Sequence, residues 1–547
     1  MDVWLMRRWT LSLALGVVLM VSGCERPTAP TADTTPAIPA ESPAKTAPVS
    51  APPAVQESPT SPPVEVPVSY PAPASVKDEP APKKETWEAQ SIRGSRTGYG
   101  YTSVHDGERN GETLELTRHV SFTSLHREGQ PVQQWIRLAS WTTPAGELRR
   151  FETEMSGGGG DLKARGVVND GKLVIDTATA GKLTQQTIEW SPEWGGFDAT
   201  ERSLSQKPMQ PGEMRTVRGL LPIFHVAGVT ELSAGDYETV QLPDGERKLL
   251  KIDSVIRIGE QKLESVLWTD EQGETIKTFI PGIGQEGVRS SREFALSGRR
   301  SGPLDLIVAS IVPLRGQLPN AARTQRVVYR ARVNQGGLKD VFENCLSQKV
   351  TAEDDQTALL EVRAVRPGVP EEPGEQEKPT DEDTAPNNLV QSDNARVVAL
   401  ARATAPEEND PWQLALALER FVHEGVAKKN FSQAFATAAE VAERREGDCT
   451  EHAVLLAALC RARELPARVA FGLVYYPPQG GFAYHMWNEV WIGDRWVPLD
   501  ATLGRGGIGA DHIKLADSSL KSSTAYSAML PVIQVFGRLE LEVLEVE

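Results

Sequence analysis

The chain has few cysteines and no long stretch of positive charge. Its 547 residues include four cysteines, at positions 24, 345, 449 and 460, and its formal net charge is −16. No Cys-x-x-Cys or His-Glu-x-x-His spacing is present, so the common zinc patterns are missing. The absence of a basic stripe argues against binding to nucleic acid, and against binding to anionic lipid by charge alone.

The N-terminus lacks an apolar run long enough to span a bilayer as a mature helix. Residues 11–21 are apolar, follow Arg7 and Arg8, and end in Ser22-Gly23-Cys24. This segment resembles a bacterial lipoprotein signal, in which Cys24 would be lipidated and become the mature N-terminus. A plain secretory signal and a twin-arginine signal are the alternatives. We therefore expect a signal peptide at 1–24 and a protein anchored by lipid in a bacterial cell envelope, facing the periplasm or the exterior.

The length predicts two or three domains rather than one core. Residues 25–86 are crowded with Pro, Ala, Ser and Thr, which predicts a disordered tether. Residues 366–388 are rich in proline and acidic residues, which predicts a linker. The two segments divide the chain into a first part at 87–365 and a second part at 389–547.

The first part is predicted to be mostly antiparallel β structure. Segments such as 132–138, 171–175 and 326–333 alternate or cluster β-forming residues between Gly, Asp and Asn turns. We find no catalytic pattern here, so this part either binds a partner or substrate, or spaces and covers the second part.

A short repeat within the first part predicts a duplication. Trp141-Thr142, Gly146-Glu147 and Arg150 match Trp268-Thr269, Gly273-Glu274 and Lys277 at the same spacing. Each copy predicts a hairpin with the glycine in its turn, and coincidence is the alternative explanation for a single match.

The second part begins with helices. Asp410-Pro411 predicts a helix start, and Thr437 with Glu440 has the spacing of a capping box. Asp448 is predicted to cap a third helix that runs from Cys449 to about Arg463. The first turn of a helix has unpaired N–H groups and the positive end of the dipole, both of which favour a thiolate. The amide of Cys449 could also stabilise an oxyanion.

Strands are expected after this helix, at 469–476, 484–492 and 496–501. Between the last two, Gly493-Asp494 predicts a hairpin turn. The hairpin would bring Asp500 beside His485, so that the carboxylate orients an imidazole that acts as the base for Cys449.

Four segments of the second part carry a resemblance to a known family. They are Gly447-Asp448-Cys449-Thr450-Glu451-His452-Ala453, Leu465-Pro466-Ala467-Arg468-Val469, His485-Met486-Trp487-Asn488-Glu489-Val490 and Trp496-Val497-Pro498-Leu499-Asp500-Ala501-Thr502. Together they resemble the bacterial transglutaminase-like domain, one of the papain-like cysteine enzymes, over residues 390–505. The resemblance implies an α+β domain in which Cys449 is the nucleophile, His485 the base and Asp500 the orienting acid, with a thioester intermediate and no cofactor.

Other interpretations of these residues remain open. His452 could be the base, although its place on the same helix favours packing or hydrogen bonding. Cys449, His452, His485 and Asp500 could together bind zinc, but their spacing does not support a site. Cys460 is expected to be a buried small hydrophobe, with a disulfide to Cys345 as a lesser alternative.

The sequence therefore predicts an α+β protein whose transglutaminase-like domain follows a mostly antiparallel β region. The expected function is a cysteine enzyme acting on amide bonds of peptides or proteins, with hydrolysis slightly favoured over acyl transfer. Trp487 and Asp448 are candidates for the substrate cleft. The alternative is a non-catalytic binding module of the cell envelope. The expected partners are a peptide or protein substrate and, through Cys24, the membrane, while the oligomeric state is left open.

Overall fold

The structure is a computed structural model that describes residues 66–74, 81–109, 111–127, 129–157, 162–179, 182–258, 261–300, 304–305, 309–334, 337–338, 341–366, 377–429, 436–521, 532 and 535–547. The expected signal peptide with Cys24 lies outside these residues, as do most of the expected tether and part of the expected acidic linker. Within the described residues, none of the helices has the length and apolar character needed to cross a membrane.

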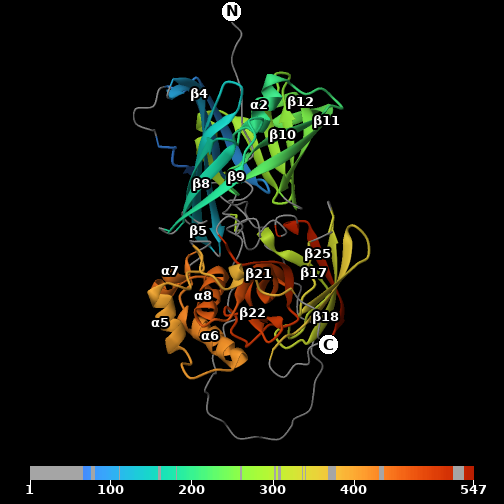
Figure 1. The fold of residues 1–547 in the computed structure, drawn as a ribbon. Coiled ribbons are helices and arrows are strands. Elements are labelled where there is room, and N and C mark those ends of the chain that lie inside the picture. Colours follow the sequence, from blue (N-terminus) through green and yellow to red (C-terminus); the bar gives the residue numbers. More distant parts are fainter. Residues whose placement is uncertain are drawn as a thin grey trace, which may run out of the picture.

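A rolled antiparallel sheet makes up the N-terminal part of the molecule (Figure 1). It has 14 strands in the order β10-β11-β12-β13-β14-β15-β2-β3-β4-β5-β6-β7-β8-β9, and we call it the N-terminal sheet. Its strands are β2 (Lys84–Ile92), β3 (Ser95–Arg109), β4 (Glu112–Arg127), β5 (Gln130–Thr142), β6 (Leu148–Gly157), β7 (Leu162–Asn169), β8 (Lys172–Thr179), β9 (Lys182–Glu189), β10 (Met214–Leu221), β11 (Val226–Leu242), β12 (Gly245–Ile258), β13 (Gln261–Thr269), β14 (Thr275–Ile280) and β15 (Gln285–Ser290). Two short helices, α2 (Ala199–Gln206) and α3 (Arg292–Leu296), accompany it.

The two predicted hairpins are present in this sheet and have the same construction. The first joins β5 to β6 and the second joins β13 to β14, and in both the register shifts after the tryptophan. The Arg150 guanidinium lies 4.7 Å from the centre of the Trp141 ring, and the Lys277 ammonium lies 5.3 Å from that of Trp268. The predicted hairpins are thus confirmed, while duplication of the whole region stays a prediction.

The end of the expected tether is ordered. β1 (Val66–Ser69) pairs with β16 (Ser297–Arg300), and Tyr70 is buried against Tyr99 and Phe122. The predicted disorder of residues 25–86 is therefore wrong at its C-terminal end, because the apolar ring of Tyr70 anchors a segment whose proline-rich composition favours an open chain.

A second sheet runs through the C-terminal part of the molecule. It has nine strands, in the order β19-β20-β18-β25-β17-β22-β21-β24 with β23 paired to β22. The strands are β17 (Val312–Arg315), β18 (Arg326–Val333), β19 (Gln348–Ala352), β20 (Thr357–Arg363), β21 (Ala467–Tyr476), β22 (Gly481–Ile492), β23 (Arg495–Leu499), β24 (His512–Ser518) and β25 (Leu539–Val546).

This sheet crosses the predicted boundary between the two parts. β25, near the end of the chain, lies between β18 and β17 and pairs with both. The strands before the expected linker at 366–388 and the strands after it therefore belong to one sheet. The described second half of the linker is ordered around the short helix η1 (Asp381–Asp383), since the buried Arg461 donates a hydrogen bond of 2.9 Å to the carbonyl of Ala385.

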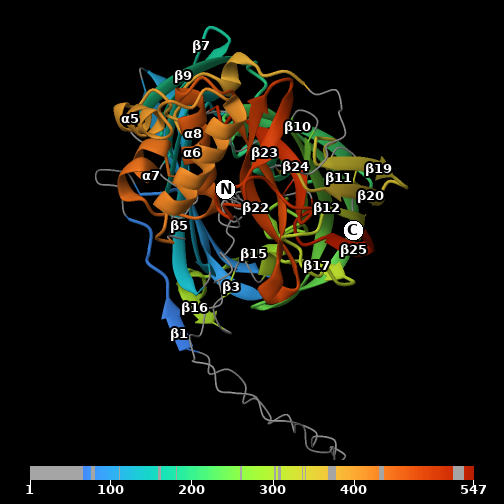
Figure 2. The ribbon, with the colours of Figure 1, turned by 90° about the horizontal axis from the view of Figure 1, so that it is seen from below.

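Helices pack against the β21 and β22 part of the second sheet, as Figure 2 shows from below. They are α5 (Ala395–Ala403), α6 (Pro411–Gly425), α7 (Ala438–Arg444) and α8 (Cys449–Ala462). The predicted caps are confirmed: Asp410 accepts a hydrogen bond from the amide of Gln413, and Thr437 forms a capping box with Glu440. The almost fully buried α8 packs on β21 and β22 and is surrounded by the other three helices. The protein is thus α+β, as the sequence predicts.

Candidate active site

The first turn of α8 presents the sulfur of Cys449. Asp448 is the N-cap and accepts a hydrogen bond of 2.9 Å from the amide of Thr450, while Glu451 reaches back to the amide of Asp448 over 2.9 Å. This capping box is specified by the sequence Asp-Cys-Thr-Glu, and it fixes Cys449 at the first helical position. The predicted helix start is therefore confirmed, and the thiol lies at the positive end of the helix dipole.

A cation from the N-terminal sheet lies at the same turn. Arg127, the last residue of β4, forms a close ion pair with Oδ2 of Asp448, and both side chains are buried. Burial lowers the pKa of Arg127, but the charges of Asp448 and Cys449 outweigh burial and raise it overall. The pKa of the Glu451 carboxyl is raised to about 8 by burial and by the charge of Asp448. The first turn of α8 therefore combines a thiol, two carboxyls and a guanidinium.

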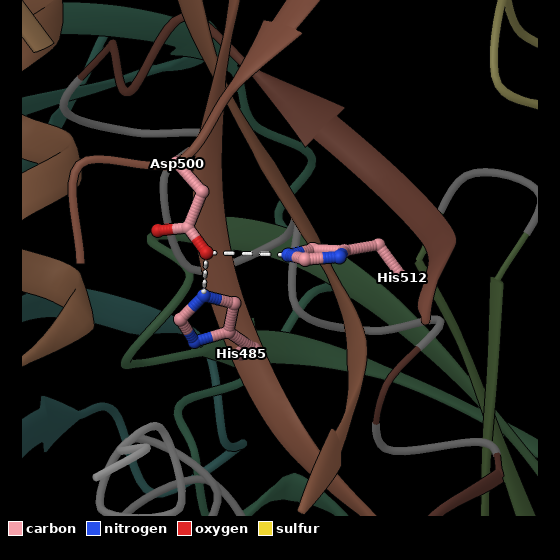
Figure 3. Close-up of side chains that lie close together, drawn as sticks. All are labelled: His485, Asp500 and His512. Atoms are coloured by element: carbon pink, nitrogen blue, oxygen red, sulfur yellow. Dashed lines mark hydrogen bonds and ion pairs between the residues drawn. The ribbon is translucent and has the colours of Figure 1, made fainter. Parts of the chain in front are cut away.

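His485 and Asp500 meet through the predicted hairpin. β22 and β23 are joined by Gly493 and Asp494, with Ile492 opposite Arg495, and Asp500 directly follows β23. Nε2 of His485 lies 2.9 Å from Oδ2 of Asp500 (Figure 3). Burial opposes ionisation of Asp500, but its contacts with His485 and His512 hold its pKa well below the usual range. The ionised carboxylate can therefore accept the Nε2 proton of His485 and fix its tautomer.

Only one of the two ring nitrogens of His485 contacts Asp500. Its side chain is fully buried, and Nδ1 has no hydrogen-bond partner among the described residues. With Nε2 bonded to Asp500, Nδ1 of the neutral ring is an acceptor. The imidazole is thus arranged to take up a proton at Nδ1.

A second histidine shares the carboxylate of Asp500. His512, the first residue of β24, directs Nε2 to Oδ2 of Asp500 over 3.2 Å (Figure 3). Its Nδ1 lies 2.8 Å from Oδ1 of Asp511. Burial lowers its pKa, but the two carboxylates outweigh burial and raise the pKa to about 9. His512 is therefore an imidazolium at neutral pH. The sequence interpretation missed it, although an Asp-His pair at the start of a strand was the available signal.

Packing connects the strand of His485 to the helix of Cys449. Asn488, three residues after His485 on β22, donates a hydrogen bond of 2.8 Å to the carbonyl of Ala453, one turn after Cys449. Trp487 stacks on His485 with ring centres 6.1 Å apart. On β21, Gly472 pairs with His485, and a Cβ there would lie 2.1 Å from the carbonyl oxygen of Ile513 and 2.5 Å from Trp487, so only glycine leaves room for the neighbouring strand and the indole. The catalytic role of Cys449, His485 and Asp500 remains a prediction.

The remaining predicted residues have structural positions. Nδ1 of His452 lies 2.6 Å from the carbonyl of Asp448 and therefore contacts the helix backbone. Cys460 is buried, as predicted, and burial raises its pKa to about 12. Cys345 and Cys460 are both free thiols, so the alternative of a disulfide between them is wrong. Trp487 and Asp448, the cleft candidates, are both buried.

The site is closed to solvent in this conformation. The exposed fraction of Cys449 is 0% and that of His485 is 2%. A surface hollow lies beside the start of α8 and is lined by Gly447 and Glu451 among others, but by neither Cys449 nor His485. A substrate would therefore need a change of conformation to reach the sulfur.

His485, Asp500 and His512 could also be considered as metal ligands, because one atom from each lies within 4.8 Å of the others. However, Oδ2 of Asp500 is already the acceptor for both imidazoles, and the raised pKa of His512 opposes the neutral ring that a metal needs. The arrangement fits a hydrogen-bonded carboxylate better than a metal site.

The geometry defines a class of site: a thiol at the start of a buried helix, packed on a strand with a carboxylate-bound histidine. Consistent with this class, residues 398–501 match the sequence profile of the family described as the transglutaminase-like superfamily. The chain therefore contains a transglutaminase-like domain. No curated protein matches the chain.

Solved structures show more distant similarity. A candidate cysteine protease from Cytophaga hutchinsonii is 15% identical, with a TM-score of 0.26, and the match covers 41% of this chain and 87% of that one. A β-barrel-like protein of unknown function from Brucella abortus is 10% identical, with a TM-score of 0.28, and the match covers 39% and 96% of the two chains. A candidate protease from Parabacteroides distasonis is 8% identical, with a TM-score of 0.17, and the match covers 62% and 64%. Because all three scores are low, these similarities support no functional assignment.

Proposed function

We propose that the protein is a cysteine enzyme that cleaves amide bonds in peptides or proteins through Cys449, His485 and Asp500. The observation that carries the proposal is the bonding of His485. Its Nε2 is committed to the Asp500 carboxylate over 2.9 Å, whereas its buried Nδ1 has no partner among the described residues. A strand that packs on the helix of Cys449 thus supplies an oriented base.

The chemistry follows from these positions. Nδ1 of His485 accepts the thiol proton, and the thiolate attacks the amide carbonyl, where the amide of Cys449 is available to the developing oxyanion. The imidazolium then protonates the leaving amine, and a thioester to Cys449 remains. Water attacks the thioester, His485 removes its proton, and the carboxylic acid product leaves with the thiol restored.

Acyl transfer differs only in the last step, in which an amine replaces water and a new amide forms. We favour hydrolysis slightly. The deciding factor is whether an amine substrate or water reaches the thioester.

We also propose that the protein acts in a bacterial cell envelope. The support is the lipoprotein-like signal ending at Cys24. The lipid anchor would hold the enzyme at the membrane, facing the periplasm or the exterior, where peptide and protein substrates are available.

A non-catalytic binding module is the second candidate. The burial of Cys449 and His485 favours it, because a permanently closed site could not turn over substrate. In that case the N-terminal sheet would be the recognition surface, and the histidine and aspartate would serve only the fold.

Mass spectrometry of a periplasmic peptide and protein mixture in ¹⁸O-labelled water tests the proposal. The wild-type protein should create new carboxyl groups that carry the label, and Cys449→Ala and His485→Ala should not. New isopeptide links instead of label would indicate the transferase reaction. Identical products from wild type and Cys449→Ala would favour the binding module.

A further inference from the structure

Acidic groups at the start of α8 oppose ionisation of the Cys449 thiol. Asp448 and Glu451 build the capping box that fixes Cys449, but this places two carboxyl groups in the same buried turn. A carboxylate beside a thiol opposes formation of the thiolate, and burial strengthens this effect because water cannot screen the charges. The helix dipole favours the thiolate, so the two influences act in opposite directions.

Arg127 supplies a compensating positive charge from another part of the chain. Its side chain has an exposed fraction of 1% and pairs with Oδ2 of Asp448, while Oδ1 of Asp448 accepts the amide of Thr450. Oδ1 of Asp448 therefore caps the helix, and Oδ2 forms the ion pair with Arg127. Arg127 lies close enough to Cys449 for a negative charge on the sulfur to raise the pKa of the guanidinium.

The position of Arg127 is fixed on the N-terminal sheet. The amide of His126 donates to the carbonyl of Leu304 over 3.0 Å, and the amide of Gly129 donates to Asp305 over 2.9 Å. These bonds hold both sides of the turn after β4. The guanidinium is therefore presented to α8 by a supported backbone rather than by a free loop.

We propose that Arg127 is a positioning residue of the thiol site, which the N-terminal sheet supplies to offset the Asp448 carboxylate at the start of α8 and so favour the thiolate of Cys449. The inference rests on the proposed function, because it assigns the charge a role at that reactive sulfur. It also gives residues 87–365 a part in the chemistry, since the C-terminal helices and sheet alone lack this cation.

The other titratable groups near this turn are known, so the effect of Arg127 can be separated from theirs. α8 and its cap contribute Asp448, Glu451 and His452, and β22, which packs on α8, contributes His485. Glu440, Arg444 and Glu446 line the hollow beside the same turn. All of these groups remain in an Arg127→Met protein. Any change in the thiol titration of that protein then reports on the guanidinium.

The test is the equilibrium titration of Cys449, followed by the far-ultraviolet absorbance of the thiolate in the full chain. The spectrum of each protein is corrected with the same protein carrying Cys449→Ser, which removes the signals of tyrosines and other cysteines. This readout needs no access to the buried sulfur. Circular dichroism and size-exclusion chromatography establish that each variant is folded.

Two variants with opposite expected signs separate charge from structure. Arg127→Met should move the thiol midpoint upward by about one pH unit or more, because the cation is lost beside Asp448. Asp448→Asn should move it downward, because asparagine still caps the helix while Arg127 remains. Arg127→Lys should stay close to wild type. The control Arg137→Met, which removes a partly exposed arginine of the same sheet, should have no effect.

A purely structural ion pair would give a different pattern. Both variants would then break the same contact and move the midpoint in the same direction, or leave it unchanged, and either result overturns the inference. If Arg127→Met does not fold, Arg127→Gln replaces it, because glutamine also removes the cation but keeps a donor for Asp448, and its thiol midpoint should likewise move upward. An unshifted titration together with turnover that depends on Cys449 would overturn the role of Arg127 and keep the proposed function. If the thiol midpoints shift as expected but no turnover depends on Cys449, the role of Arg127 is kept and the proposed function is overturned.

Discussion

Stability of the protein should depend on the charge of His512, and the dependence can be calculated from the structure. His512 has its pKa raised from 6.5 to about 9 by Asp511 and Asp500 against the effect of burial. A raised folded-state pKa contributes stability that is complete below the unfolded pKa and is lost as the pH rises through the folded one. The folded and unfolded pKa values of His512 differ by roughly 2.5, which corresponds to about 3 kcal/mol of the free energy of unfolding. This contribution should disappear between about pH 6.5 and pH 9.

The perturbation is His512→Gln, which keeps a donor for Asp500 but cannot ionise. Other buried groups also titrate in this range: Glu88 and Glu419, for example, have their pKa values raised to about 8 by burial. The free energy of unfolding of every variant should therefore fall with pH, and the informative quantity is the difference between wild type and His512→Gln.

Urea unfolding, followed by tryptophan fluorescence from about pH 5.5 to 9.5, gives this difference. We expect it to be largest at the acidic end and to decrease by about 3 kcal/mol toward the alkaline end. Asp511→Asn keeps an acceptor for Nδ1 but removes the negative charge that raises the pKa of His512, so it should narrow the pH range over which stability is lost. Parallel curves for wild type and His512→Gln would refute the assignment of His512 as a buried imidazolium.

Three further changes give defined outcomes. Asp448→Ala should lower the free energy of unfolding by about 3–5 kcal/mol, because it leaves the buried Arg127 without its carboxylate; chemical denaturation measures this, and a loss below about 1 kcal/mol would contradict it. Gly472→Ala should lower the free energy of unfolding by about 1–3 kcal/mol, since its Cβ would lie 2.1 Å from the carbonyl oxygen of Ile513 and 2.5 Å from Trp487; unchanged thermal unfolding would speak against this packing. Asp500→Asn should reduce turnover by about 10⁴-fold through the wrong histidine tautomer, and product formation in the ¹⁸O experiment at near wild-type rates would exclude that role.

Local features of the C-terminal part could be predicted from the sequence because they depend on near neighbours. The caps at Asp410, Thr437 and Asp448 each involve residues within three positions. The hairpin that brings Asp500 to His485 needs only Gly493-Asp494 and two flanking strands. These contacts leave a pattern in the sequence at fixed spacing.

The contacts that the sequence did not reveal join distant segments. Arg127 and Asp448 are 321 positions apart, and nothing near Arg127 in the sequence marks it as different from other arginines in strands. The place of β25 between β18 and β17 likewise depends on how the chain returns after the helices. His512 lies only 12 positions from Asp500, but its contact requires β24 to pair with β21.

The reactivity of Cys449 tests the central claim most directly. The rate of alkylation by iodoacetamide should be measured at mildly acidic pH, where an ordinary thiol is mostly protonated, in proteins that carry Cys24→Ser, Cys345→Ser and Cys460→Ala to remove background labelling. The cavity left by His485→Ala can only ease access to the buried sulfur, so faster labelling of wild type reports on activation of the sulfur. The account predicts that wild type is labelled at Cys449 at least about tenfold faster than His485→Ala. Equal, slow labelling of the two proteins would contradict it.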